Sequence, residues 1–274
     1  MDRSLVWLAS YPKSGNTWLR AFMGNYFFAH DRPMPLEDVK RVSSGDSSGP
    51  HYTEITGKAP ADLTPSEQMR ARLTVLRRIA GQAPMSLVKT HAANAAVTGV
   101  PLIPPALTRL AIHVVRDPRD VLVSYADHFG QTLEEAAGTM ARPTARLLAS
   151  DRVVAQYPGG WSQHTASWAD ARGFPVLCLR YEDMTADPER AFARVVEAMG
   201  APLDRVALRE AIERSSFRSL AAMEAEGGFS EASPNSARFF RQGRAGGWRE
   251  TVPGPLAKRV RANHRAMMRR FGYA

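Results

Sequence analysis

Apolar residues form four short runs, each ending in polar or basic residues, at positions 5–10, 86–89, 110–115 and 175–179. Runs of this length between polar clusters are typical of buried strands. Between them, apolar residues recur with the period of an α-helix over residues 17–28, 65–79, 119–129, 162–171 and 188–199. Because strands that alternate with helices favour a parallel sheet covered on both faces, we predict an α/β fold. Its central sheet should be mostly parallel, with four to five strands flanked by helices.

Two stretches lack this periodicity. Residues 41–61 are rich in Gly, Ser, Pro and Thr, and we expect a mobile loop there, able to gate a pocket. Residues 224–247 are weakly patterned and contain several glycines, and they precede a basic helix that we predict over residues 256–271. Since neither an internal repeat nor a linker is evident, we predict a single domain over residues 1–274.

The composition narrows the classes of partner without choosing one. The 274 residues are 44% hydrophobic, and 36 Lys and Arg against 27 Asp and Glu give a net charge of +9. This charge favours an anionic ligand, an acidic surface or a nucleic acid. The single cysteine, Cys178, excludes an intrachain disulfide, and no Cys/His cluster indicates structural zinc. No apolar run reaches the roughly 18 residues of a membrane helix, so we predict a cytoplasmic protein without a transmembrane segment.

The polar cluster Y-P-K-S-G-N-T-W, at residues 11–18, lies between the first predicted strand and the first predicted helix. Gly15 permits a tight turn whose backbone N–H groups point at an anion, and the helix adds the positive end of its dipole. Lys13 adds a mobile positive charge. The order is not that of a Walker A loop, because the lysine precedes the glycine. A plain strand-to-helix turn with a solvated lysine is the alternative interpretation.

A second cluster, V-V-R-D-P-R-D-V-L-V-S-Y at residues 114–125, again joins a strand end to a helix. Arg116 ends the strand, and Ser124 lies about two turns into the helix, from which it can face back toward the strand end. An arginine fork and a serine hydroxyl both suit a phosphate. In the alternative interpretation, Arg116 pairs with a nearby carboxylate, either Asp117 or Asp120, while Ser124 packs against a neighbour.

A third cluster, R-Q-G-R-A-G-G-W-R at residues 241–249, sets flexible glycines among arginines that can close over a phosphate. Considered alone, it equally fits a solvated basic loop. Together, however, the three clusters resemble the nucleotide-dependent sulfotransferase family. The first match is highly specific and the second is good. The third resembles R-K-G-x-x-G-D-W-K, with Gln242 for lysine, Gly247 for aspartate and Arg249 for lysine.

This resemblance implies a P-loop-kinase-like fold. It also implies 3′-phosphoadenosine 5′-phosphosulfate (PAPS) as the donor and 3′-phosphoadenosine 5′-phosphate (PAP) as the product. The 5′-phosphosulfate would be held by Lys13, Ser14, Gly15, Asn16, Thr17 and Trp18. The 3′-phosphate would be held by Arg116, Ser124, Arg241, Gln242 and Gly243. The adenine would be surrounded by Trp18, Tyr181 and Phe217, whose aromatic faces suit it. Since Gln242 removes one positive charge, the grip on the 3′-phosphate is expected to be weaker, or to draw on Arg244 or Arg238.

Lys89-Thr90-His91 follows the second predicted strand and resembles the family's K-x-H segment, whose histidine is the catalytic base. The resemblance implies that His91 takes the acceptor's proton during in-line attack on sulfur, because imidazole titrates near working pH. Lys13 would neutralise charge on the leaving oxygen, with Lys89 assisting. No metal is needed in this scheme, since lysines and backbone N–H groups supply the positive charge.

The acceptor is much less defined by the sequence. We expect it to bind to segments outside the donor motifs, namely residues 22–30, 41–61, 130–156 and 224–240. Their Met, Phe and Tyr content indicates a partly apolar acceptor. A phenol, an alcohol, a lipid or a glycan hydroxyl all fit, with a small-molecule or lipid-like hydroxyl slightly favoured. Because the K-x-x-x-T-V-x-x-x-E dimer segment of cytosolic animal enzymes is not found, the oligomeric state stays open.

Two other classes of protein share some of these features. A nucleotide kinase would have the same sheet and phosphate loop, but should show the Walker A order. A nucleic-acid-binding module is suggested by the net charge and by the basic residues near the C-terminus, Lys258, Arg259, Arg261, His264, Arg265, Arg269 and Arg270. A solvated or donor-facing basic helix explains these residues better, and we expect no nucleic-acid partner.

Overall fold

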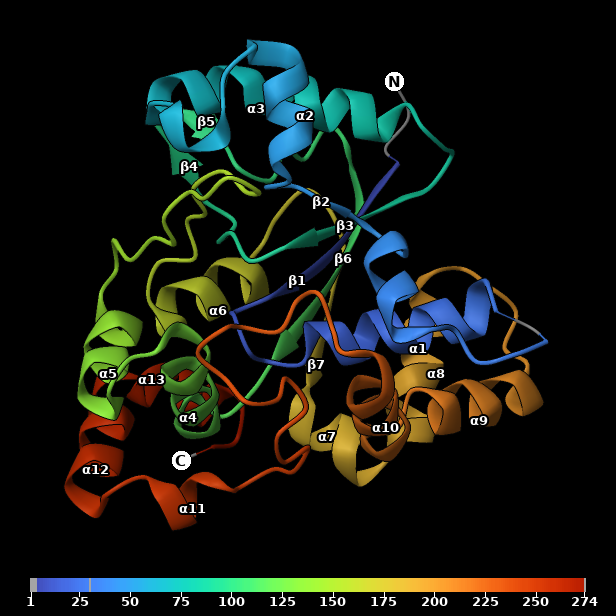
Figure 1. The fold of residues 1–274 in the computed structure, drawn as a ribbon, viewed down its shortest axis with the longest axis vertical. Coiled ribbons are helices and arrows are strands. Elements are labelled where there is room, and N and C mark those ends of the chain that lie inside the picture. The colour runs from blue at the N-terminus through green and yellow to red at the C-terminus, as the bar shows by residue number, and fades with distance from the viewer. Residues whose placement is uncertain (1–3, 30, 274) are drawn as a thin grey trace. The chain divides into compact units, whose positions relative to one another are not determined.

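The computed structural model describes residues 4–29 and 31–273 (Figure 1). The chain divides into two compact units. Unit 1 comprises Met1–Tyr11, Ser43–His113 and Arg142–Cys178, and unit 2 comprises Pro12–Val42, Val114–Ala141 and Leu179–Ala274.

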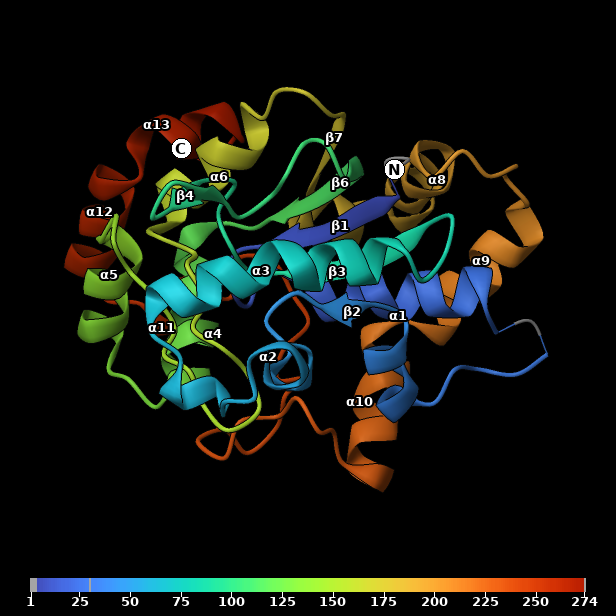
Figure 2. The same ribbon diagram turned by 90° about the horizontal axis from the view of Figure 1, so that it is seen from above.

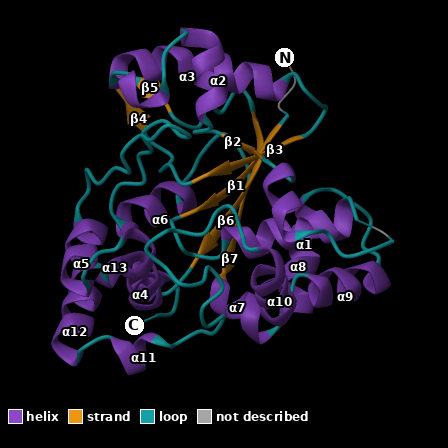
Figure 3. Cartoon of the chain, in the orientation of Figure 1, coloured by secondary structure: helices purple, strands orange, loops and turns teal. Residues whose placement is uncertain are grey.

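The central sheet has five strands in the order β2-β3-β1-β6-β7 (Figure 3), and it lies in unit 1 except for the last two residues of β6 and of β7. Their bounds are β1 Leu5–Ser10, β2 Ser44–Gly45, β3 Ser86–Thr90, β6 Thr108–Val115 and β7 Val176–Arg180. Both β1 and β2 run parallel to β3. Every residue of β1 is buried, as expected for a strand covered on both faces. The four predicted strands are therefore confirmed, and β2 is a fifth. A separate antiparallel pair is formed by β4 Ala96–Val97 and β5 Val100–Pro101.

The helices of unit 1 are α2 Gly49–Thr56, the 3₁₀ turn η2 Pro60–Asp62, α3 Pro65–Ala80 and α6 Trp161–Ala169. Helix α3 begins with a capping box, in which Thr64 accepts from the Glu67 N–H and Glu67 reaches back to the Thr64 N–H. In the view of Figure 2, α3 lies in front of β3. The apolar side of α3, with Val75, Leu76 and Ile79, belongs to one core cluster. The same cluster contains the strand residues Leu5, Trp7 and Val88.

The prediction that residues 41–61 form a loop is wrong. The stretch contains β2, α2 and η2, although it has no apolar periodicity. Tertiary contacts replace the missing pattern, because Tyr52 is fully buried and Asp46 is 2% exposed. Gly49 allows a close approach, since a Cβ there would lie 2.6 Å from Pro60 and 2.8 Å from a backbone oxygen.

Unit 2 is helical. Its elements are α1 Asn16–Phe27, the 3₁₀ helix η1 Leu36–Arg41, α4 Pro118–Phe129, α5 Leu133–Ala141, α7 Tyr181–Ala186, α8 Pro188–Ala198, α9 Arg205–Arg214, α10 Phe217–Gly227, α11 Trp248–Thr251, α12 Gly254–Asn263 and α13 Arg265–Arg270. Helices α1 and α9 pack together. The hydroxyl of Tyr26 in α1 accepts from the Asp204 N–H and donates to the Pro202 carbonyl just before α9.

The prediction of one helix over residues 256–271 is also wrong. The helix is interrupted at His264, which has φ −113° and ψ 14° and separates α12 from α13. The imidazole of this residue is 3% exposed, so the break coincides with a buried polar side chain. Upstream, residues 228–247 contain neither helix nor strand, in agreement with the weak pattern of that stretch.

Candidate functional site

The turn between β1 and α1 has a backbone that few residues adopt. Lys13 has φ 69° and Gly15 has φ 107°, both in the left-handed region. A Cβ on Gly15 would lie 2.8 Å from the ring of Tyr181, so both the backbone angle and the space require glycine. Gly15 is also the N-cap of α1 and makes no side-chain hydrogen bond to its first turn. The start of α1 is thus suited to an anion.

Two side chains of this turn fit the same ligand chemistry. The hydroxyl of Ser14 is buried, and within the described residues it has no hydrogen-bond partner. A buried hydroxyl without a partner is costly unless a ligand completes it. The Lys13 Nζ lies 3.4 Å from Nδ1 of His128 and 4.0 Å from the centre of the Phe239 ring. The turn therefore combines a cation with an available donor.

The side chains of Asn16 and Thr17 are engaged by Arg20, which sequence reasoning missed. Arg20 is 1% exposed and donates to Asn16 Oδ1 and Thr17 Oγ1, each at 3.1 Å. Its charge is paired with Glu231, 2.6 Å away. No local pattern marks Arg20, because its role depends on a carboxylate from a distant segment.

Arg116 lies beside the turn between β1 and α1 and is not in an ion pair with any described residue. Its Nη2 donates to the Arg244 carbonyl at 3.0 Å, its Nη1 lies 3.5 Å from the Lys13 carbonyl, and its guanidinium stacks 4.1 Å above the Tyr181 ring. Its Nε has no hydrogen-bond partner among the described residues. The alternative in which Arg116 pairs with Asp117 or Asp120 is wrong.

Both aspartates have other partners. Asp117 forms an ion pair with Arg119 at 2.6 Å. Asp120 accepts the backbone N–H groups of Gly246 and Trp248 at 2.7 and 2.9 Å, and Arg119 stacks 4.0 Å above the Trp248 ring. The third motif, residues 241–249, is thereby hydrogen-bonded to the first turn of α4. Sequence reasoning missed Asp120 as this anchor, although an acidic residue in a first helical turn is the kind that accepts such bonds.

The other residues of the third motif lie in different surroundings. Gly243 has φ 60°, and a Cβ there would lie 2.1 Å from the ring of Phe217, so these two predicted site residues are in contact. Arg241 is exposed and its Nε lies 3.7 Å from Asp127. Arg244 pairs with Glu250, and the Gln242 amide oxygen lies against Gly247.

The three aromatic residues predicted around the adenine form one pair and one separate contact. Trp18 and Tyr181 pack edge to face with ring centres 5.6 Å apart. Phe217 instead packs against Phe240, at 6.4 Å between ring centres. Ser124 is partly exposed in α4. All the predicted donor-binding residues thus belong to unit 2.

The K-T-H segment belongs to unit 1. Lys89 pairs in register with Leu8, and the Nδ1 of His91 lies 2.8 Å from the Ser10 carbonyl. A carbonyl only accepts hydrogen bonds, so Nδ1 carries the proton and Nε2 keeps its lone pair.

A second histidine, His164 of α6, lies close to this segment. It is fully buried, and its ring centre is 5.5 Å from that of Tyr11. Burial lowers the pKa of His164 well below its usual value, and electrostatic repulsion from His113 and His91 adds to this effect. It is therefore neutral at ordinary pH.

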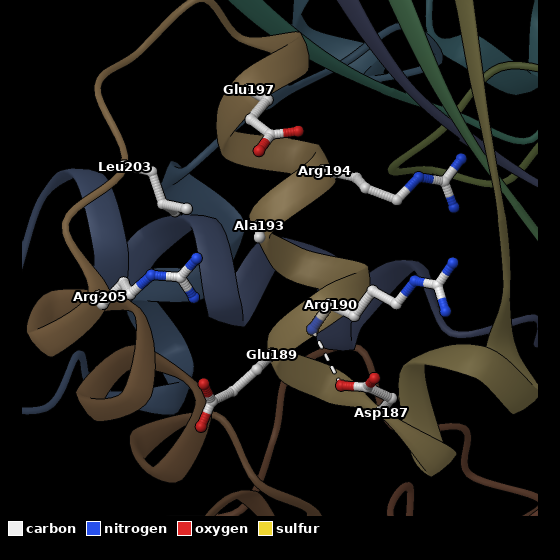
Figure 4. A pocket seen from close by; sticks show the side chains of 8 residues that line it. All are labelled: Asp187, Glu189, Arg190, Ala193, Arg194, Glu197, Leu203 and Arg205. Atoms are coloured by element: carbon white, nitrogen blue, oxygen red, sulfur yellow. Dashed lines mark hydrogen bonds between the residues drawn. The ribbon is translucent and has the colours of Figure 1, made fainter.

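A shallow pocket of about 400 Å³ lies on α8 and the start of α9 (Figure 4). Its charged lining residues are Asp187, Glu189, Arg190, Arg194, Glu197 and Arg205, all exposed. The Asp187 carboxylate accepts the Arg190 N–H at 3.0 Å and caps α8. Because the charges balance, we assign no ligand there. Over the described part of the chain, neither a group of three or more potential metal ligands nor a helix long and apolar enough to span a membrane is found.

Comparisons with known proteins place this geometry in context. A family model described as a sulfotransferase domain matches residues 3–272. Cytosolic sulfotransferase 12 of Arabidopsis thaliana is 26% identical over 265 residues, covering 92% of this chain and 74% of that protein. Sulfotransferase 1A1 of Bos taurus is 26% identical over 221 residues, covering 78% and 64%.

Solved structures show the same fold. Mouse sulfotransferase SULT7A1 complexed with PAP has a TM-score of 0.62 at 17% identity, over 98% of this chain and 86% of that one. Retinol dehydratase in a complex with retinol and PAP has a TM-score of 0.65 at 17% identity, over 98% and 82%. The predicted α/β fold with a parallel five-stranded sheet is confirmed.

Proposed function

The chain belongs to the sulfotransferase domain family, and on that premise we propose that it transfers a sulfuryl group from PAPS to an acceptor hydroxyl or amine. The observation that carries this proposal is the turn before α1. At this turn, Lys13 has a left-handed backbone, and Gly15 has no space for a side chain. The Ser14 hydroxyl has no hydrogen-bond partner among the described residues, and no side chain caps the start of α1.

The residues of unit 2 fit a nucleotide phosphorylated at both ends. Lys13, Ser14 and the N–H groups of residues 15–18 would hold the 5′-phosphosulfate. Arg116 would hold the 3′-phosphate with Ser124 and with Arg241, Gln242 and Gly243. The Nε of Arg116, which has no partner among the described residues, supports this role. The paired rings of Trp18 and Tyr181, with Phe217, would contact the adenine.

The chemistry would follow from the protonation states of this chain's own groups. When bound, PAPS supplies the sulfuryl group and a 5′-phosphate leaving group. His91 would take the acceptor's proton at Nε2, while the Ser10 carbonyl holds Nδ1–H and stabilises the imidazolium. Lys13 would donate to the leaving oxygen, with Lys89 adding positive charge. Since Ser10 precedes Lys13 by only three positions, the residue that orients the base is close in sequence to the residue that stabilises the leaving group.

For the acceptor, we propose a small-molecule or lipid-like hydroxyl compound. Retinol dehydratase, a protein of the same fold, has been solved with retinol and with androsterone, which supports an apolar hydroxyl compound here. Of the expected acceptor segments, residues 22–30 include His30, which lies outside the described residues. The absence of a nucleic-acid partner and the cytoplasmic location stay predictions.

The donor assignment is tested by calorimetric titration with PAP beside adenosine 5′-phosphate. We expect PAP to bind at least about tenfold more tightly, because charged hydrogen bonds to the 3′-phosphate contribute roughly 1.5–3 kcal/mol. Arg116→Ala should remove most of that preference. Arg190→Ala, which removes an exposed arginine of α8 in the same unit, should leave it intact. Equal weak binding of both nucleotides to the unaltered protein would contradict a dedicated 3′-phosphate site.

The base assignment is tested by His91→Ala with labelled PAPS and a panel of hydroxyl acceptors. We expect transfer to fall by at least about 10²-fold, the typical contribution of a general base, with PAP affinity nearly unchanged. His51→Ala, in α2 of the same unit, controls for the loss of a histidine from unit 1. Near-normal turnover in His91→Ala would exclude His91 as the base.

A further inference from the structure

Thr90, between Lys89 and His91, holds the backbone on both sides of the proposed base. It is 1% exposed, and its hydroxyl accepts the Ala92 N–H at 3.0 Å. This bond spans His91, so the peptide groups before and after the histidine are fixed relative to one another. The same hydroxyl donates to Asp46 Oδ2 at 2.8 Å. Thr90 thus uses both its donor and its acceptor capacity.

Asp46 contacts the segment a second time through its backbone. Its N–H donates to the Lys89 carbonyl at 3.2 Å, directly after β2 pairs Gly45 with Lys89. The hydroxyl of Tyr52 donates to the Asp46 carbonyl at 3.1 Å. Asp46 is therefore held in place by β2 and α2, and it contacts both of the residues that precede His91.

The charge of Asp46 is neutralised by Arg72 of α3. Nη2 of Arg72 lies 2.7 Å from Asp46 Oδ2, and the two side chains are 4% and 3% exposed. Arg72 also donates to the Leu102 carbonyl through Nε and Nη2, at 3.1 and 2.7 Å. Burial opposes the charge of Arg72, but Asp46 and Tyr52 outweigh this effect and raise the pKa of Arg72 above its usual value. Arg72 therefore keeps its charge, and the orientation of the pair is fixed by several directional bonds.

A buried ion pair of this kind contributes little net stability, because the cost of removing both charges from water offsets their attraction. What it provides is a defined geometry. We propose that Asp46, Arg72 and Thr90 form a positioning network that holds His91 in its reactive orientation. The network links α3, β2 and β3, whereas Ser10 orients the His91 ring itself. This inference rests on the proposed role of His91 as base.

The test is Thr90→Val, which keeps the shape of the side chain and removes the hydroxyl. We expect kcat to fall by about 10- to 100-fold, since small misplacements of a reacting group have effects of this order. The KM values for PAPS and acceptor should change by less than about threefold, because ground-state binding is unaffected. Thr90→Ser, which restores the hydroxyl, should recover kcat to within about threefold of the unaltered enzyme.

Thr108→Val is the matched control. Thr108 lies in β6 of the same unit, is fully buried, accepts from Trp7 Nε1 and donates to the Pro104 carbonyl, each at 2.9 Å. It makes as many hydrogen bonds as Thr90 but touches neither Asp46 nor the K-T-H segment. A kcat loss in Thr90→Val no larger than in Thr108→Val would overturn the proposal. If Thr90→Val does not fold, Tyr52→Phe removes one bond to Asp46 and should lower kcat in the same direction, by about three- to tenfold; an unchanged kcat would again overturn it.

A measurement without turnover separates this inference from the proposed function. The NMR titration of the His91 ring should show an altered pKa and altered line shape in Thr90→Val, and an unaltered titration in Thr108→Val. If the unaltered protein transfers no sulfuryl group, the proposed function fails, while the ring titration still decides whether the network orients His91. An identical His91 titration in both variants would overturn the network.

Discussion

Gly243 is the position in the third motif at which a side chain is least tolerated. Its φ of 60° disfavours any other residue, and a Cβ would meet the Phe217 ring at 2.1 Å. Gly243→Ala should therefore displace Phe217 and weaken PAP binding about tenfold by calorimetry, with a loss of about 1 kcal/mol in the free energy of unfolding. Gly200→Ala is the control, because Gly200 has φ 73° but no neighbouring atom within 4 Å. It should lose similar stability and no PAP affinity; equal affinity in the two variants would show that Phe217 does not contribute to the site.

Whether a site residue could be predicted from the sequence depends on whether the signal for it is local or comes from a distant segment. Lys13, Gly15 and Arg116 are recognisable because a short motif contains each of them at a strand end. Asp120 and Asp46 are not recognisable, because their partners are far away in sequence. The Asp46 carboxylate accepts a hydrogen bond from the Thr90 hydroxyl, 44 positions later in the chain. No sequence pattern in either segment predicts this contact.

Helices and strands, too, could be predicted where a local apolar pattern marks them and not where distant contacts form them. The strands β1, β3, β6 and β7 were predictable because each is a continuous apolar run, which is the pattern of a strand buried on both faces. Strand β2 was not, since Ser44–Gly45 has no apolar residue and exists through its pairing with β3. Helix α2 lacked a signal because only two of its eight residues, Gly49 and Tyr52, are buried, and two buried positions form no apolar period. These two elements form the surroundings of Asp46, so the part of the fold that the sequence concealed is the part that carries the positioning network.

Taken over the whole chain, three buried histidines connect the fold to its behaviour in acid. His113 and His164 are fully buried in unit 1, and His264 is 3% exposed in unit 2. Burial lowers the pKa of His113 to about 3 and that of His264 to about 4, and it lowers the pKa of His164 well below its usual value. All three are therefore neutral in the folded protein at pH 7, so no positive charge is buried at these positions.

Acid should consequently destabilise the protein well before its carboxylates are protonated. Below about pH 6.5 the unfolded chain binds protons at these histidines and the folded chain does not, so the free energy of unfolding falls as the pH drops toward 3 or 4. Each such histidine should cost about 2 kcal/mol between pH 7 and pH 5, measured by urea denaturation at closely spaced pH values. His113→Phe keeps a ring to stack on Trp168, which lies 6.1 Å away between ring centres, and removes the titrating group. Its stability should therefore depend on pH with a slope smaller by one proton over this range, whatever the variant does to stability at pH 7. A slope equal to that of the unaltered protein would mean that His113 binds its proton in the folded state as readily as in the unfolded chain. The burial of His113 would then not contribute to the acid sensitivity of the fold.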